Sequence, residues 1–314
     1  MQADVPFASP RSRDKQFEKK LSNTIFILIL IKCFCKDGSG VKGRKVEWEL
    51  HSSLTSSASE TLLNRQADPE PVEVVNARST SPILLVCEHA GQAIPRKLGA
   101  LGLTDEQLAM HIAYDIGSEK LARNLAASLD CTLILQRYSR LVLDCNRPPE
   151  SDQSIPAVSD RVVIPGNRDQ TSSDRNARIS EIFEPFATAC KAQIARQSVQ
   201  YTYSIHSFTP LLNDQARPWD IGFLYRHEKS RGADLLRLAA RLWPTMTIGD
   251  NEPYRIDDES DWYIPVCAEK REIPHSLIEV RNDLLLTDDG CREWGGRLHD
   301  LLSQFMEIND ATRS

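Results

Sequence analysis

Six short apolar runs, separated by segments with helical spacing, constrain the fold of this chain most. Each run is five residues long, and they lie at 83–87, 132–136, 141–145, 201–205, 221–225 and 276–280. A strand that is apolar along its whole length has both faces buried, as in a parallel sheet covered by helices. Helical patterns fill intervals at about 104–129, 176–197, 231–242 and 288–306. The alternation predicts an α/β protein with a mostly parallel sheet and helices on both of its faces.

Local signals mark where several of these elements begin and end. Thr104 is followed three positions later by Gln107, which is the pairing of a helix capping box. Apolar residues at four-residue spacing continue to Leu129, and Gly117 predicts a break into two helical segments. A polar, proline-rich stretch at about 147–175 predicts a loop.

The first 70 residues predict a poorly structured extension and linker, or a translation start assigned upstream of the domain. Their most apolar run, Thr24–Ile31, is far shorter than the roughly 20 residues that span a bilayer. The basic segment before that run resembles a signal peptide, but no A-x-A-like cleavage site follows. Ser, Pro and acidic residues without a sustained period continue to Ser81 and are typical of a linker. We expect a single globular domain that starts near residue 70 and occupies residues 71–310.

Charge and cysteine content narrow the class of protein. The 314 residues carry a formal net charge of −6, which gives no electrostatic reason to expect nucleic acid or an anionic membrane as a partner. Eight cysteines without short regular spacing do not form the pattern of a disulfide framework, so a reducing compartment is expected. These features together predict a cytoplasmic protein.

Chemically capable side chains stand at the ends of four predicted strands. They are Glu88 and His89 after 83–87, Asp144, Asn146 and Arg147 around the end of 141–145, His206 after 201–205, and Glu279 within 276–280. The carboxyl ends of neighbouring parallel strands meet at one edge of a sheet, so we expect these side chains to converge. Two histidines far apart in the sequence suit the scattered ligands of a catalytic zinc, and no CxxC or HExxH pattern is present.

Each of these residues also has a purely structural interpretation. Either histidine alone could be a hydrogen-bonded loop residue. Glu279, flanked by apolar residues, must find a partner or shift its pKa upward; a salt bridge to Arg281 and a general base near neutral pH are the two alternatives. Asn146 and Arg147 could close a loop before two prolines, or could bind a carboxylate through amide and guanidinium groups.

Eight sequence motifs stand in order over roughly residues 80–308. They are VCEHAG…IP at 86–95, HIAYDIGSEKLARNLA at 111–126, YSRLVLDCNRPP at 138–149, IPGN at 164–167, SIHSFTP at 204–210, RPWDIGFLY at 217–225, NEPY at 251–254 and LIEVRNDLL at 277–285. Through these motifs the chain resembles the N-formylglutamate amidohydrolase family. The resemblance implies a fold similar to that of zinc carboxypeptidases and aspartoacylases, a three-layer α/β/α sandwich around a mixed, mostly parallel sheet.

The resemblance also implies roles for individual residues. Relatives of that fold bind zinc through two histidines and one acidic residue, use a glutamate as general base, and hold the substrate carboxylate with an Asn-Arg pair. The matching positions in this sequence are His89 and His206 for the histidine ligands, Glu279 for the base, and Asn146 with Arg147 for the pair. We therefore expect the two imidazoles to lie within about 4 Å of each other around one cation.

The motifs leave two candidates for the acidic ligand, because one position departs from the pattern of the relatives. Their first ligand motif is H-x-x-E, and here the fourth position is Gln92, whose neutral amide is a poor zinc ligand. Asp115 is preferred, since it lies in a motif of the resemblance among apolar neighbours, where an unpaired carboxylate would be costly. Glu88 is the alternative, and Asp115 could instead cap a helix terminus.

The reaction that the resemblance implies is zinc-dependent hydrolysis of the formyl amide of N-formyl-L-glutamate or a similar N-acyl amino acid. One Zn²⁺ per chain, or another divalent metal, would lower the pKa of water, and Arg140 would stabilise the oxyanion. A small dicarboxylate as substrate implies further cationic groups, for which Arg217, Arg255 and Arg281 are equally suitable in sequence.

Three other functions compete with this expectation. The same residues would serve an amidohydrolase for a different N-acyl amino acid, and a non-catalytic homologue would keep the fold as a metal- or ligand-binding protein. A membrane-tethered protein would use the apolar run near the N-terminus. The sequence does not distinguish oligomeric states.

Overall fold

The computed structural model describes residues 61–313 of the chain. Residues 1–60 of the predicted extension, including the apolar run Thr24–Ile31, therefore lie outside the described residues. Within the described part, no helix is both long enough and apolar enough to cross a membrane.

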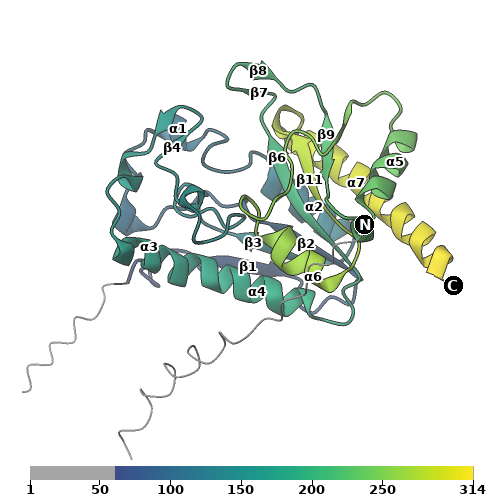
Figure 1. Cartoon of the computed structure of the whole chain (residues 1–314), viewed down its shortest axis with the longest axis horizontal. Helices are drawn as coiled ribbons and strands as arrows, with labels where there is room; N and C mark the ends of the chain where they lie inside the picture. The colour runs from purple at the N-terminus through teal and green to yellow at the C-terminus, as the bar shows by residue number, and fades with distance from the viewer. Residues whose placement is uncertain (1–60, 314) are drawn as a thin grey trace, which may run out of the picture. The chain divides into compact units, whose positions relative to one another are not determined.

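A seven-stranded mixed sheet forms the centre of the fold (Figure 1). Its strands, in spatial order, are β1 (Val72–Val75), β3 (Thr132–Gln136), β2 (Ile83–Cys87), β6 (Tyr201–Phe208), β11 (His275–Arg281), β9 (Ile221–Leu224) and β10 (Ile248–Asp250). The four strands β3, β2, β6 and β11 run parallel to one another. β1 and β9 pair antiparallel with their neighbours β3 and β11, and β10 is parallel to β9. The predicted mixed, mostly parallel sheet is confirmed.

Helices cover both faces of this sheet. They are α1 (Asp105–Leu108), α2 (Ser118–Ser128), α3 (Ser172–Arg178), α4 (Glu184–Ile194), α5 (Gly232–Leu242), α6 (Glu269–Arg271) and α7 (Asp288–Arg313). A π-helical turn, Ile179–Phe183, joins α3 to α4, and another, Ile264–Ala268, leads into α6. Two small hairpins complete the fold, β4 (Val158–Ser159) with β5 (Val162–Val163), and β7 (Leu211–Leu212) with β8 (Gln215–Ala216).

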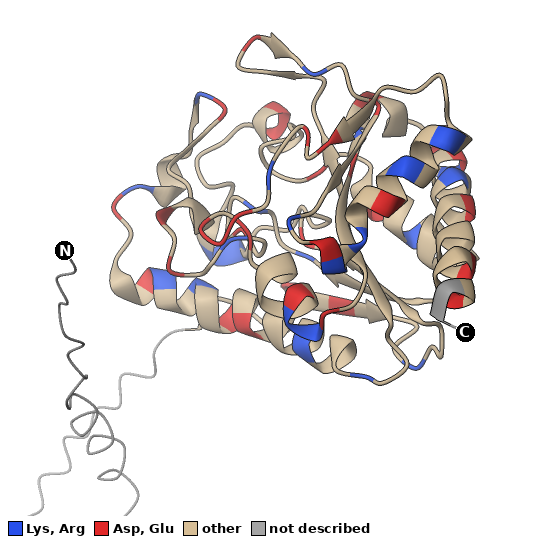
Figure 2. Cartoon of the chain, turned by 45° about the vertical axis from the view of Figure 1, so that its right-hand side comes forward, with Lys and Arg blue, Asp and Glu red and all other residues tan. Residues whose placement is uncertain are grey.

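The alternation of side chains along β2 explains why this strand is apolar throughout. Leu84 and Val86 pack with α4 in one core cluster, whereas Leu85 and Cys87 pack with α2, α5 and α7 in the other. Successive side chains of a strand point to opposite faces, so a strand between two helical layers must be apolar at every position. The outer sides of α5 and α7 carry basic and acidic residues side by side (Figure 2). The predicted three-layer sandwich is confirmed.

The helical signals are confirmed in part. Thr104 and Gln107 form the predicted capping box, but α1 ends after one turn. The stretch up to Ile116 is not helical, because its backbone bonds to other loops: the amide of Asp115 donates to the carbonyl of His89, and Arg140 donates to the carbonyl of Ala113. The predicted break at Gly117 is confirmed, with a φ of 81° just before α2.

The helix expected at about 176–197 begins earlier than predicted. α3 starts at Ser172, because Thr171 caps it with Asp174 in a second capping box, and the helix continues through the π-helical turn into α4. The expected loop is therefore shorter than the range 147–175.

The prediction of a strand at 141–145 is wrong. Every apolar residue of this segment is buried, but it follows an irregular turn rather than a strand. Its carbonyl groups find side-chain partners in place of a neighbouring strand: Asn167 donates to the carbonyl of Leu141 at 2.7 Å, and Arg178 donates to that of Val142 at 2.9 Å. The apolar run at 141–145 therefore reflects burial of these side chains and not strand structure.

The linker prediction is also wrong for part of its range. Val72–Val75 is the edge strand β1, whose half-buried residues pair with β3. Upstream of it, Leu62 is buried, and its amide and that of Leu63 donate to the carboxylate of Glu181 at 2.7 and 2.8 Å. The composition of this region predicted a linker because prolines and acidic residues flank the short strand β1. Neither β10 nor the two small hairpins was predicted.

Candidate metal centre and active site

Three neighbouring parallel strands bring the expected polar side chains to one edge of the sheet. His89 lies just beyond the end of β2, while His206 and Glu279 lie inside β6 and β11 and are paired in register. β6 continues for two residues past His206, so this histidine is part of the strand rather than of the following loop. The structure thus brings together residues that are far apart in the sequence.

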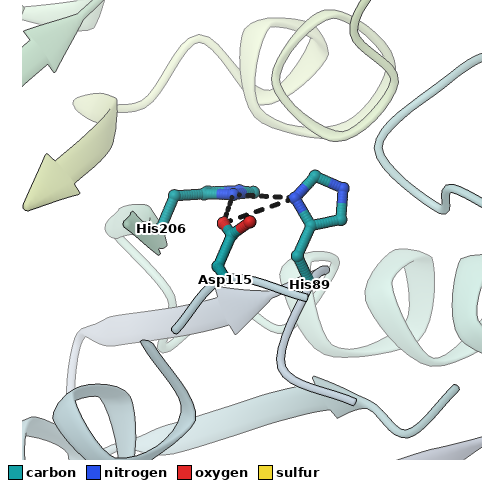
Figure 3. A group of neighbouring side chains, drawn as sticks. All are labelled: His89, Asp115 and His206. Carbon is teal, nitrogen blue, oxygen red and sulfur yellow. Dashed lines mark hydrogen bonds and ion pairs between the residues drawn. The ribbon is translucent and has the colours of Figure 1, made fainter. Parts of the chain in front are cut away.

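His89, Asp115 and His206 face one another at this edge (Figure 3). The Nδ1 atoms of the two imidazoles are 3.1 Å apart, and Asp115 Oδ2 lies 2.7 Å from Nδ1 of His206 and 3.4 Å from Nδ1 of His89. All three side chains are buried, with exposed fractions of 2–4%. Ligand atoms at about 2.0–2.1 Å from a tetrahedral ion lie about 3.3 Å from one another. The three atoms therefore have the spacing of ligands to a single ion.

The far nitrogen of each imidazole is bound to a second carboxylate. Nε2 of His89 lies 2.6 Å from Asp144 Oδ1, and Nε2 of His206 lies 3.0 Å from Glu88 Oε2. Ser204 Oγ adds a bond of 2.6 Å to the same Glu88 oxygen. An ionised carboxylate only accepts hydrogen bonds, so Asp144 and Glu88 favour the tautomer with the proton on Nε2, in which each Nδ1 atom keeps a lone pair.

Three acceptors in such close contact require positive charge between them. Burial lowers the pKa of His206, but the carboxylates of Glu88 and Asp115 outweigh burial and raise it well above the ordinary value. Burial raises the pKa of Asp115, yet the two imidazoles hold it well below the ordinary value. The acidic surroundings therefore favour a cation at this point, which either an additional proton or a metal ion supplies.

Asp115 and Glu88 occupy different positions around His206. Asp115 contacts the Nδ1 atoms that face each other, whereas Glu88 contacts the opposite nitrogen of His206. Since Glu88 lies on the far side of the ring, only Asp115 shares a common point with both Nδ1 atoms. Gln92 does not line this pocket.

Glu279 is buried with an exposed fraction of 5%, and its Oε2 atom has no hydrogen-bond partner among residues 61–313. Burial raises its pKa to about 7. The alternative of a salt bridge to Arg281 is wrong, because the Arg281 guanidinium bonds instead to Asp283 at 2.8 Å and lies 3.4 Å from Asp220. Glu279 is thus a carboxyl group with a free oxygen beside the three facing side chains.

Arg140 bridges two of the buried carboxylates. Its guanidinium donates to Asp144 Oδ2 at 2.7 Å and to Asp115 Oδ1 at 3.2 Å. About a quarter of the side chain, 26%, remains exposed, and it lines the same pocket as Glu279. Both contacts fix the direction of the guanidinium.

Asn146 and Arg147 reach this pocket, but part of their hydrogen-bonding capacity is already used. Asn146 Nδ2 donates to Asp261 Oδ1 at 3.1 Å, and Arg147 donates to the carbonyl of Ser260 at 3.1 Å. The Arg147 side chain keeps an exposed fraction of 30%. Arg147 therefore has donors left for a ligand, whereas Asn146 chiefly joins its loop to the segment at Asp261.

The sequence reasoning missed several pocket residues. The pocket has a volume of about 290 Å³ and is lined by His89, Asp115, Arg140, Asp144, Asn146, Arg147, His206, Ser207, Leu224, Tyr254, Arg255, Ser260, Asp261, Leu277 and Glu279. The run Asp257–Asp261 contains four acidic residues, which was the available signal for the unpredicted Ser260 and Asp261. Burial raises the pKa of Asp261.

Comparison with known proteins agrees with the motifs. A sequence model of the family described as N-formylglutamate amidohydrolase matches residues 81–286. The chain is similar to the crystal structure of a gene product from Agrobacterium tumefaciens, with 36% identity, a TM-score of 0.75, and coverage of 79% of this chain and 99% of that one. It is also similar in fold to N-formylglutamate amidohydrolase from Ralstonia eutropha JMP134, with 17% identity, a TM-score of 0.60, and coverage of 76% and 98%. No curated protein sequence matches it significantly.

Proposed function

The chain belongs to the N-formylglutamate amidohydrolase family, and we propose that it hydrolyses the formyl amide of N-formyl-L-glutamate or a similar N-acyl amino acid with the help of a bound metal ion. The products are the free amino acid and a carboxylate. The observation that carries the proposal is the common point faced by the Nδ1 atoms of two imidazoles and one carboxylate oxygen, beside the free carboxyl oxygen of Glu279.

The residues at this point fit a divalent cation, and His89, Asp115 and His206 would hold it. Two imidazole nitrogens and one carboxylate oxygen form a donor set that suits zinc, and three protein ligands are typical of catalytic zinc sites. When bound, the ion would supply a Lewis acid that lowers the pKa of water and polarises a carbonyl group. Asp144 and Glu88 would then hold the two imidazoles in the tautomer that presents Nδ1.

Glu279 is the proposed general base. Its raised pKa of about 7 suits a group that accepts a proton from the attacking water and returns it to the leaving nitrogen. Arg140 would stabilise the negative charge that develops on the carbonyl oxygen, because its contacts with Asp115 and Asp144 hold it at the wall of the pocket. Arg147 would bind the substrate carboxylate, and Asn146 would support it through its bond to Asp261.

The remaining parts of the proposal concern the setting of the reaction. We propose residues 71–310 as the catalytic domain and the cytoplasm as its location. Six cysteines of the described region are free and buried, which supports a reducing compartment. A small acyl-amino-acid substrate suits a pocket of about 290 Å³, at the lower end of the range for ligand sites.

Elemental analysis combined with turnover assays tests this function. Purified protein is expected to contain one equivalent of metal and to release formate from N-formyl-L-glutamate. Chelation should abolish release, and zinc should restore it. Full turnover in metal-free protein would contradict the metal requirement, whereas no turnover in metal-loaded protein would indicate a binding protein without catalysis.

A further inference from the structure

Substrate recognition requires positive groups beyond those that hold the reacting centre. Arg140 is already bound to Asp115 and Asp144, so its charge is balanced within the protein. Arg147 donates one hydrogen bond, to a backbone carbonyl, and its Nε atom lies 3.8 Å from Asp144, so most of its donors remain to bind one carboxylate. A second anionic group on the substrate would need another cation at the same pocket.

Two of the three arginines that suit this role in sequence are engaged elsewhere. Arg281 bonds to Asp283 and the carbonyl of Pro218, and it does not line the pocket. Arg217 donates to the hydroxyl of Tyr254 at 2.8 Å, with its guanidinium 4.6 Å from the centre of the same ring. Arg217 therefore supports the pocket wall from outside.

Arg255 differs from both. It lines the pocket, its side chain is exposed, and within residues 61–313 its guanidinium has no hydrogen bond or ion pair to the protein. A guanidinium carries five N–H donors that match a carboxylate in a bidentate arrangement. Arg255 can thus accommodate an anionic ligand without first breaking a protein contact.

The backbone that carries Arg255 is nevertheless held in place. The amide of Asn251 donates to the carbonyl of Phe223 at 3.0 Å, and Ile256 is buried with an exposed fraction of 6%. The carbonyl of Glu252 lies so close to β9 that a Cβ atom at Gly222 would approach it to 1.8 Å. A free guanidinium on a fixed segment loses little entropy of the backbone when it binds.

We infer that Arg255 determines specificity by pairing with a carboxylate in the substrate side chain. The enzyme would thereby select N-acyl derivatives of acidic amino acids over neutral ones, with Arg147 binding the α-carboxylate and Arg255 the second carboxylate. This inference rests on the proposed function and adds to it the residue that recognises the second carboxylate of the substrate. A side-chain amide of the same size would lose the charge-assisted pair.

Steady-state kinetics with two isosteric substrates test the inference. Metal-loaded, full-length wild type, Arg255→Gln, Arg255→Lys and the control Arg292→Gln are compared on N-formyl-L-glutamate and N-formyl-L-glutamine. Arg292 is 62% exposed on α7 and lies outside the pocket. We expect the ratio of the two kcat/KM values to fall at least tenfold in Arg255→Gln, to recover in part in Arg255→Lys, and to stay at the wild-type value in Arg292→Gln.

A wild type that hydrolyses both substrates equally well, or an unchanged ratio in Arg255→Gln, would overturn the inference while leaving the proposed function intact. If neither substrate is hydrolysed, equilibrium binding of L-glutamate and L-glutamine to the same variants decides the matter. Glutamate binding that weakens at least tenfold in Arg255→Gln supports the role of Arg255 even though the proposed reaction fails. Binding that is indifferent to Arg255 rejects it.

Discussion

Buried carboxylates favour a proton on one particular nitrogen of each site imidazole. Asp144 and Glu88 bind the Nε2 atoms of His89 and His206, so the Nδ1 atoms can both act as acceptors. The same histidines without these partners would be free to adopt the other tautomer. The chemistry of the site therefore depends on pairs of residues rather than on the histidines alone.

Replacing Glu279 by Gln should separate catalysis from metal binding. The amide keeps the size of the side chain but cannot accept a proton, so turnover should fall about 10²- to 10⁴-fold. Metal content should stay at the wild-type value, since Glu279 is not among the three facing side chains. Formate release and elemental analysis on the same preparation measure both quantities. Turnover equal to that of wild type would remove Glu279 from the role of base.

Replacing Asp115 and Glu88 separately should identify the acidic ligand. Asp115→Ala removes an oxygen that faces both Nδ1 atoms, so stoichiometric zinc binding should be lost. Glu88→Gln alters only the partner of the far nitrogen, and zinc affinity should fall about 10- to 100-fold. Competition with a chromophoric chelator gives both affinities, and Glu293→Gln on the surface of α7 is the control. The reverse order of effects would make Glu88 the ligand.

The irregular segment 141–145 positions the site through contacts with a distant helix. Asn167 donates to the carbonyls of Leu141 and Pro156 and accepts a bond from Arg178, which itself donates to Val142. These bonds replace the ladder that a strand would have and hold the chain that leads to Asp144. Side chains from α3 and its preceding turn thus determine the path of a site loop.

Asn167→Ala should destabilise the protein by about 1–3 kcal/mol, because it leaves buried carbonyl groups without a donor. The free energy of unfolding from urea titrations measures this loss. Asn176→Ala is a suitable control, since Asn176 is exposed on α3 and should change stability by less than about 0.5 kcal/mol. Equal stability of the two variants would show that water satisfies the carbonyl groups instead.

Across the whole molecule, the site lies where the central strands β2, β6 and β11 end between the two helical layers. Among the described residues, five carboxyl groups are buried there, at Glu88, Asp115, Asp144, Asp261 and Glu279. Burying like charges is unfavourable, so part of the folding free energy should depend on a cation at this place.

Zinc should therefore stabilise the fold as well as permit catalysis. A ligand that binds only the folded state at 100 times its Kd adds about 2.7 kcal/mol, which should raise Tm by about 5–10 °C in a domain of this size. Thermal unfolding with and without zinc measures the shift. The double variant His89→Ala with His206→Ala should show no shift, and a shift of wild-type size in that variant would place the metal elsewhere.

The sequence by itself determined the central strands and indicated most of the side chains that are proposed for the site. A strand covered on both faces must be apolar at each position, and this requirement is local, so runs such as Ile83–Cys87 revealed it. Polar residues at the ends of those runs then indicated the site.

Only the tertiary structure decided which side chains meet. Asp115 lies near both Nδ1 atoms, and Asn146 binds Asp261, although these residues come from segments that share no sequence pattern. The free guanidinium of Arg255 at the pocket likewise depends on which segments pack around it. Segment 141–145 is another example. Its residues are buried without forming a strand, because the side chains of Asn167 and Arg178 donate hydrogen bonds to its backbone carbonyl groups. Contacts through space depend on how loops close, and local sequence carries little information about that.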